Sequence, residues 1–428
     1  MTLSWFQIVR LGLVQMCLGA IVVLTTSTLN RLMVVELSLA AVVPGLLVAL
    51  HYGIQMSRPK WGFASDAGGR RTGWIIGGMA ALGAGALLAT AAILLFEASF
   101  ALGMAVSVVA YALIGLGVGA SGTSLLALIA TTTAPRRRAA AATITWLMMI
   151  LGITVTAITV GALIDPYTPA VLFEVVLGVT VTAVALTVLA VWGVERHLIA
   201  VTEPDPTPFR QGLAEVWQER RARNFTLFVF LSMTAYFMQE LILEPYAGLV
   251  FAFTPGQSTS LSGAQNGGTF IGMLLVGVLA TGFGIGNLRA WVMAGCVGSA
   301  ASLGALAFIG PLGAGAPLVP VVMGLGFFNG MFAVAAIGSM MALAGSGRDR
   351  REGTRMGLWG AAQAVAAGFG GLAGATFVDL LRLTTTDATA YGTVFIGEAI
   401  LFLAAAAMAA RIMDRNPVAH PSTLVPGE

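Results

Sequence analysis

The sequence predicts an all-α membrane protein of twelve transmembrane helices, arranged as two six-helix bundles. Its composition carries the first part of this prediction. Of the 428 residues, 57% are hydrophobic and only 10% are charged, whereas a soluble domain has about 25% charged residues. The chain therefore lacks the polar surface that a water-facing body needs, and its hydrophobicity excludes a disordered protein. We expect no nucleic-acid partner, because the basic residues lie at the edges of apolar runs beside the lipid bilayer.

Apolar runs long enough to span a membrane, about 20 residues each, recur between charged, Pro and Gly residues. The twelve predicted spans are 9–29, 34–56, 73–96, 100–130, 139–163, 170–193, 225–250, 262–285, 289–310, 317–344, 355–381 and 391–411. The polar stretch between the sixth and seventh spans predicts a linker with an amphipathic surface helix. The predicted domains are a bundle at 1–193, a cytoplasmic linker at 194–224, a bundle at 225–411 and a cytoplasmic tail at 412–428.

The basic residues predict the orientation. With twelve spans, 20 of the 22 Lys and Arg residues fall on the side of the N-terminus, and only Arg31 and Arg382 fall on the other. Because Lys and Arg favour cytoplasmic loops, we expect both termini to be cytoplasmic. The strength of the bias also favours an even number of spans.

An internal repeat predicts the division into two halves. Arg138 stands eight residues before Trp146 after the fourth span, and Arg351 stands eight residues before Trp359 after the tenth. The segment 30–36 also corresponds to the segment 238–244. Two six-span halves joined by a polar linker are typical of transporters built from parallel repeats.

The loop between the second and third spans resembles the signature loop of the major facilitator superfamily. It has Gly62, Asp66 and Gly69, followed by Arg70 and Arg71. The glycines permit a tight reversal, Asp66 is suited to cap a helix, and the arginines suit an anionic lipid surface. Ala67 stands where the superfamily usually has a basic residue. We expect these five residues, with Arg138 and Arg351, to form a conformational loop region.

Polar residues inside a membrane are candidates for function, and they cluster at the predicted outer helix ends. They are Asn30, Arg31, Glu36, Gln239, Glu240, Glu244 and, beside them, Pro245. Glu240 and Glu244 are four residues apart and share a helix face, and Pro245 should end or kink that helix. We interpret the cluster as a gate or a ligand site. The alternative is an Arg31–glutamate pair that only locks the two bundles together. No carboxylate is expected at the midplane.

His51, in the inner half of the second predicted span, is a candidate magnesium ligand of a tetrapyrrole, because neutral imidazole binds metals. The alternative is a histidine hydrogen-bonded within the packing. Cys17 and Cys296 lie in apolar runs and suggest neither a disulfide nor a zinc site. With no phosphate-binding loop and no hydrolase motif, we expect no enzyme, no nucleotide and no protein-bound metal.

Three segments resemble the PucC/LhaA family, major-facilitator-like proteins of phototrophic bacteria. These are 24–37, containing Thr-Leu-Asn-Arg-Leu; 238–251, containing Gln-Glu-Leu-Ile-Leu-Glu-Pro; and 355–364, Arg-Met-Gly-Leu-Trp-Gly-Ala-Ala-Gln-Ala. Ser27 and Ala40 replace a usual Gly and a usual Pro. The resemblance implies a multi-pass protein of the bacterial inner, or intracytoplasmic photosynthetic, membrane.

The same resemblance implies a function and partners. It implies assembly of light-harvesting antenna complexes, with bacteriochlorophyll as bound cargo that passes from its synthesis enzymes to antenna polypeptides. Two other hypotheses remain open at this point. One is a secondary transporter of a small amphipathic solute, and the other is a structural scaffold without a ligand of its own.

Overall fold

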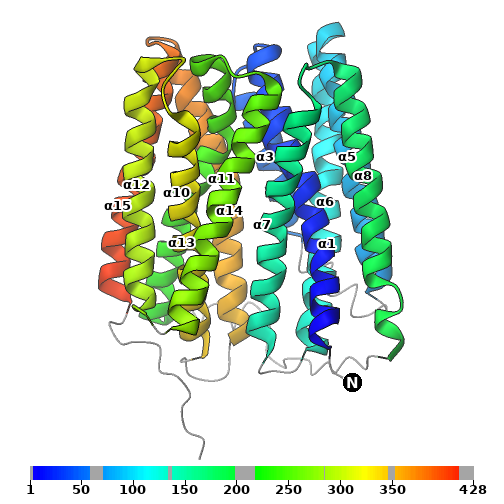
Figure 1. Ribbon diagram of the computed structural model, residues 1–428, viewed down its shortest axis with the longest axis vertical. Coiled ribbons are helices and arrows are strands. Elements are labelled where there is room, and N and C mark those ends of the chain that lie inside the picture. The colour runs from blue at the N-terminus through cyan, green and yellow to red at the C-terminus, as the bar shows by residue number, and fades with distance from the viewer. Residues whose placement is uncertain are drawn as a thin grey trace, which may run out of the picture.

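The structure, a computed structural model, describes residues 3–57, 71–133, 137–197, 217–283, 285–345 and 352–413. Throughout these ranges the regular structure is helical, and the long helices stand side by side along one common direction (Figure 1). This confirms the predicted all-α class. Eleven of the described helices are long and apolar enough to cross a membrane, and a twelfth apolar helix is shorter.

The described helices of the N-terminal half follow each other along the chain. They are α1 (Trp5–Val23), η1 (Leu24–Thr28), α2 (Leu29–Arg31), η2 (Leu32–Glu36), α3 (Val42–Gln55), α5 (Thr72–Ala98), α6 (Phe100–Thr132), α7 (Arg138–Leu163) and α8 (Pro169–Val191). The segments α1, η1, α2 and η2 form one continuous span over Trp5–Glu36.

The described part of the C-terminal half has six long helices. They are α10 (Arg220–Phe251), α11 (Pro255–Val276), continued by η5 (Gly277–Gly282), then α12 (Leu288–Ile309), α13 (Leu318–Gly345), α14 (Glu352–Arg382) and α15 (Asp387–Ile412). A short turn, η6 (Gly310–Leu312), follows α12. The predicted spans correspond in order to the described helices of both halves, although the predicted eighth begins later than α11 does.

The first two predicted spans need correction. The first was expected to end at residue 29, but the helix continues to Glu36, so Asn30, Arg31 and Glu36 all lie on the first helix. Two of these polar side chains, Asn30 and Arg31, are buried within the protein, so they need no contact with lipid. The second helix is correspondingly short in its described part, Val42–Gln55.

Buried hydrophobic side chains form two large clusters. One draws on helices of the N-terminal half, together with Leu241, and the other on residues from Phe225 to Met413. The division falls at the linker between α8 and α10. Residues 198–216 of this linker, including the start of the predicted amphipathic helix, lie outside the described residues. Val194–His197 forms a short turn, η4, and α10 begins at Arg220, so the end of the predicted surface helix belongs to α10.

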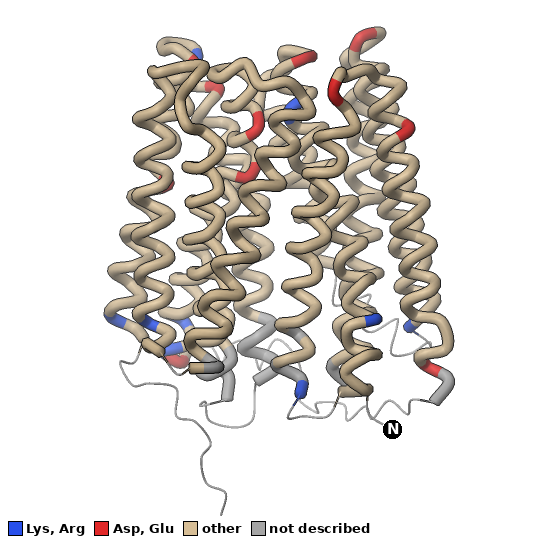
Figure 2. The backbone as a smooth tube through the Cα atoms, in the orientation of Figure 1, with Lys and Arg blue, Asp and Glu red and all other residues tan. Residues whose placement is uncertain are grey.

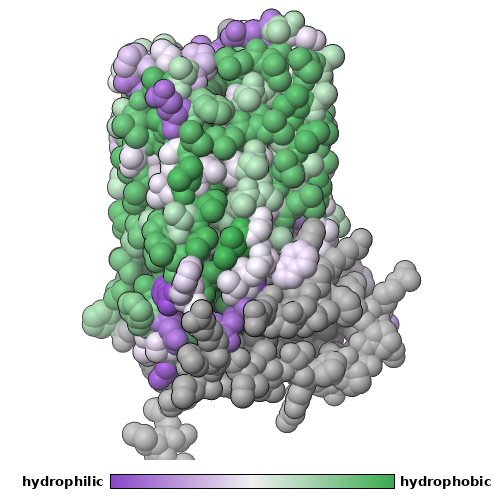
Figure 3. All heavy atoms as spheres, turned by 90° about the vertical axis from the view of Figure 1, so that its right-hand side faces the viewer, coloured by the Kyte–Doolittle hydropathy of each residue, from purple (hydrophilic) through white to green (hydrophobic). Residues whose placement is uncertain are grey.

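The described chain starts and finishes at the same end of the bundle (Figure 1). We call the opposite end the distal end. Lys and Arg gather mainly at the end that bears the termini (Figure 2), which agrees with the charge bias in the sequence. In a view turned by 90°, hydrophobic residues cover most of the height of the described surface, with hydrophilic residues at the distal edge (Figure 3). Such a surface suits a lipid environment.

Two helix pairs make the most extensive contacts between the halves: α7 with α11, and α3 with α14. The first pair approaches closely at glycines, since a Cβ on Gly256 would meet the carbonyl oxygen of Gly161, and a Cβ on Gly161 would meet that of Gly256. Small residues let membrane helices pack backbone to backbone in this way. The boundary between the bundles, near the distal end, is where most of the predicted site residues lie.

Candidate functional site

The first helix departs from regular α-helix geometry where it carries the predicted polar residues. Two π-helical segments, η1 and η2, flank the single turn of α2 that contains Asn30 and Arg31. Such wide turns are rare in proteins, and those that occur are often at functional sites. In η1 the carbonyl oxygen of Thr25 accepts a hydrogen bond from the hydroxyl of Tyr111 on α6, at 2.8 Å. No sequence pattern predicts this role of Tyr111, because its partner is a backbone group.

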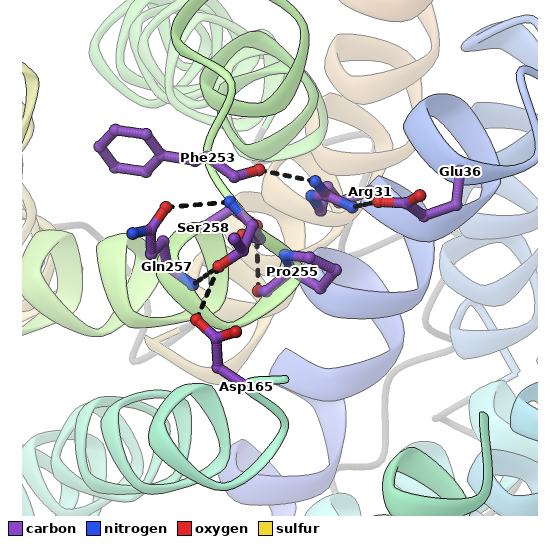
Figure 4. A network of polar contacts seen from close by, with 8 residues as sticks. Arg31, Glu36, Asp165, Phe253, Pro255, Gln257 and Ser258 are labelled. Atoms are coloured by element: carbon purple, nitrogen blue, oxygen red, sulfur yellow. Dashed lines mark hydrogen bonds and ion pairs between the residues drawn. The ribbon is translucent and has the colours of Figure 1, made fainter. Parts of the chain in front are cut away.

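Arg31 connects the two halves through a backbone oxygen. Its side chain is 2% exposed and pairs with Glu36 on the same helix, with Nη1 to Oε1 at 2.5 Å. Its Nη2 donates to the carbonyl oxygen of Phe253, just beyond α10, at 2.7 Å (Figure 4). The ion pair therefore lies within the first helix, and the cross-bundle link is to a carbonyl. The alternative to a functional site was an Arg31–glutamate pair that locks the two bundles together. The pair with Glu36 is not of this kind, because both residues lie on the first helix.

Two neighbouring side chains of the first helix make further cross-bundle hydrogen bonds. Asn30 Nδ2 donates to the carbonyl oxygen of Leu241 on α10 at 2.6 Å. The hydroxyls of Thr28 and Thr259 on α11 lie 3.1 Å apart, and both are buried. Both contacts satisfy polar groups that would be costly to bury alone. Thr28, Asn30 and Arg31 lie within about one turn of the first helix, and they bond to α11, to α10 and to the residue just beyond α10.

On α10 the predicted glutamates have different environments. Glu244 is buried and its Oε1 accepts from the Ser262 hydroxyl of α11 at 2.5 Å. Glu240, one turn earlier, is less buried. Gln239 is buried on the same helix. Two buried acceptors here, Gln239 Oε1 and Glu244 Oε2, have no hydrogen-bond partner in the described part of the chain, so the site retains free oxygen atoms.

Pro245 lies inside α10, and the helix continues beyond it to Phe251. Of the two outcomes expected for this proline, an end or a kink, the helix does not end there. Packing overrides the local preference, because Glu244, Pro245 and the following two residues are all buried. The helix ends instead at Ala252, which adopts a left-handed conformation with φ of 56°.

His51 lies on α3 and is 1% exposed. Its Nε2 is 2.7 Å from Nε2 of Gln55, one helical turn away, and its ring packs edge-on against Tyr52 at 4.9 Å between centroids. Tyr52 in turn contacts Phe237 of α10, at 5.7 Å. Ligation of magnesium through Nε2 would require Gln55 to release this nitrogen.

Of the predicted conformational loop, only a part is described. Gly62, Asp66, Gly69, Arg70 and Arg351 lie outside the described residues, and Arg138 is the first residue of α7.

Arg71 is buried, and its Nη1 donates to the carbonyl oxygen of Ala127 at 3.1 Å. The carboxylate of Glu195, after α8, accepts from the backbone amides of Arg71 and Thr72 at 2.8 and 3.0 Å. Glu195 thus caps the start of α5, where a negative charge stabilises a helix.

A buried acid that the sequence pattern does not predict lies in the middle of α15. Glu398 is fully buried, and neither carboxylate oxygen has a hydrogen-bond partner within the described ranges. The expectation of no midplane carboxylate is therefore wrong.

In the same bundle, the Ser299 hydroxyl of α12 donates to Asn329 Oδ1 of α13 at 2.8 Å. Among the described residues no group of three or more His, Cys, Asp or Glu side chains is placed to hold a metal ion.

Fold and site together define a multi-pass membrane protein of the two-bundle transporter type, with a polar site between its halves. The crystal structure of a peptide transporter, POT, in complex with sulfate has the same fold: the TM-score is 0.71 over 96% of each chain, at 15% sequence identity.

The chain belongs to the PUCC protein family, whose sequence model matches residues 28–416. It is 63% identical, over the full length of both chains, to the "Bacteriochlorophyll synthase 44.5 kDa chain" of Rhodobacter capsulatus. It is 31% identical to "Protein PucC" of Cereibacter sphaeroides, over 90% of this chain and 86% of that one. The expected family is thereby confirmed.

Proposed function

We propose that this protein is an assembly factor for photosynthetic light-harvesting complexes that binds bacteriochlorophyll and delivers it to antenna polypeptides in the bacterial inner membrane. The observation that carries the proposal is the family match over residues 28–416, together with a full-length relative whose name contains bacteriochlorophyll. Its partners would be the enzymes that make the pigment and the antenna polypeptides that receive it. The protein itself acts without catalysing a reaction, despite the word synthase in that relative's name.

The polar site between the bundles supports binding of such a cargo. The site lies on two segments that carried the family resemblance, 24–37 and 238–251. Its free acceptors, Gln239 Oε1 and Glu244 Oε2, are the oxygen type that magnesium prefers. Either oxygen is a more direct candidate for the pigment's magnesium than His51, whose Nε2 faces Gln55. The surrounding apolar helices suit the remainder of a tetrapyrrole.

Substitution of Glu244 tests the binding proposal. The Glu244→Gln variant keeps the size of the side chain and removes its charge. We expect pigment that co-purifies with the protein, measured by absorption per mole of protein, to fall several-fold at equal expression. Glu174→Gln is the matched control, because Glu174 lies on α8 and is exposed. Wild-type protein purified without pigment from a host that makes bacteriochlorophyll would contradict the proposal.

A secondary transporter of a small amphipathic solute is the second candidate function. The peptide-transporter fold and the buried Glu398 in the middle of α15 favour it. Uptake of a solute by reconstituted vesicles, driven by an ion gradient and lost in the Glu398→Gln variant, would support this alternative. A structural scaffold, by contrast, would retain the synthesis enzymes in a pull-down without any bound pigment.

A further inference from the structure

Asp379, near the distal end of α14, caps a helix of the opposite bundle. Its two carboxylate oxygens accept from the backbone amides of Ala41 and Val42, at 2.9 and 2.7 Å. These amides stand at the start of α3, whose first turn has no capping side chain of its own. The first amides of a helix lack partners within the helix and lie at its positive end. The C-terminal half therefore supplies the missing cap of a helix in the N-terminal half.

Asp165, just after α7, makes the reciprocal contact. Its Oδ2 accepts from the hydroxyl of Thr254 at 2.8 Å (Figure 4). Thr254 is the residue that caps the start of α11, where its side chain accepts from the backbone amide of Gln257. Here an acid of the N-terminal half lies at the start of a helix in the C-terminal half.

The internal repeat relates these two contacts. Arg351 and Trp359 each follow their counterparts, Arg138 and Trp146, by 213 residues. A shift of 213 residues aligns Ala41 with Thr254, and it aligns Asp165 with the position directly before Asp379. Each half thus presents one aspartate, from the end of its fifth helix, to the start of the second helix in the other half. Unrelated surface contacts would not be expected to fall at matching positions of the two halves.

We propose that Asp165 and Asp379 form a pair of cross-bundle carboxylate contacts that hold the distal ends of the two bundles together and set how often that end opens. The two contacts are unequal. Asp379 is partly buried and uses both oxygens, while Asp165 is exposed and uses one. Exposed contacts are screened by water and contribute less than partly buried ones. Loss of Asp379 should therefore open the distal end more than loss of Asp165.

Distance measurements between the bundles test the proposal. Spin labels are attached at Leu163, which ends α7, and at Leu383, which follows α14; these side chains are 57% and 80% exposed. Pulsed electron resonance on the full chain in lipid nanodiscs then reports the fraction of molecules with separated distal ends. In Asp379→Ala we expect the ratio of separated to closed molecules to rise about tenfold, and in Asp165→Ala about threefold.

The matched control is Asp387→Ala. Asp387 is also a distal acid, but its partner, Arg382, belongs to the same bundle, with Nε to Oδ1 at 2.7 Å, so the distance distribution should stay at that of the wild type. Asp379→Asn keeps one acceptor oxygen and should give a smaller increase than Asp379→Ala. It serves as the test if the alanine variant does not fold. Distributions unchanged in the Asp379 and Asp165 variants, or moved equally by Asp387→Ala, would overturn the proposal. The readout is a distance, so it stands or falls independently of pigment binding.

Discussion

Buried ionisable side chains are accommodated in two different ways in this molecule. Between the bundles, Arg31 has an acidic partner and a carbonyl oxygen as ligands, and Glu244 has a serine hydroxyl. Inside the C-terminal bundle, Glu398 is equally buried and has no partner in the described part of the chain. The first arrangement holds elements together. Burial of Glu398 without a partner lowers the stability of the fold. The presence of this acid therefore needs a reason other than stability.

Loss of Arg31 should have the largest effect on stability. Arg31→Gln removes the bond to Phe253 and the pair with Glu36, and hydrogen bonds to charged groups contribute about 1.5–3 kcal/mol each. Glu36 is 42% exposed and can be hydrated, so we expect the loss to be about 2–3 kcal/mol in total. Thermal unfolding of the purified protein in detergent measures it.

Arg382→Gln is the comparison for this measurement. Arg382 and Asp387 are 29% and 37% exposed, and exposed pairs contribute about 0–1 kcal/mol. If both arginine variants lowered the unfolding midpoint equally, burial at the boundary would not be what makes Arg31 important.

Replacement of Glu398 should act in the opposite direction. Glu398→Leu removes two buried acceptors without partners and keeps a similar volume, so we expect the free energy of unfolding to rise by about 1–3 kcal/mol. Glu398→Gln remains polar and should change it little. A stabilised leucine variant that has lost activity would indicate that the acid is kept for function at the expense of stability. A destabilised one would show that Glu398 has a partner in the folded protein.

The sequence predicted the helices well because apolar runs between charged residues mark spans in lipid. It also singled out polar residues that lie at the boundary between the bundles, since Asn30, Arg31 and Glu244 are polar groups in apolar surroundings at repeated positions. It misplaced the end of the first helix, because Arg31 was read as the limit of a span, while burial between bundles lets a charged residue continue one.

Other features of the structure have no sequence pattern that would predict them. Asp379 and Tyr111 bond backbone groups, and a backbone amide or carbonyl has no sequence signature. Glu398 is a lone acid within an apolar run, and nothing in the one-dimensional pattern distinguishes its side of α15 from the lipid-facing side. Only the packing of the neighbouring helices shows that it is buried.

The smallest effect is expected at Tyr111, and it separates stability from function. Tyr111→Phe removes one hydrogen bond to the π-helical segment η1, and Tyr246→Phe removes an equivalent one, to the carbonyl oxygen of Leu306 in α12 at 2.7 Å. Both tyrosines are buried, so each variant should lose about 1 kcal/mol. Only Tyr111 supports the helix that carries Asn30 and Arg31. Bound pigment should therefore fall in Tyr111→Phe and stay unchanged in Tyr246→Phe, and equal pigment in both would show that the geometry of η1 serves packing alone.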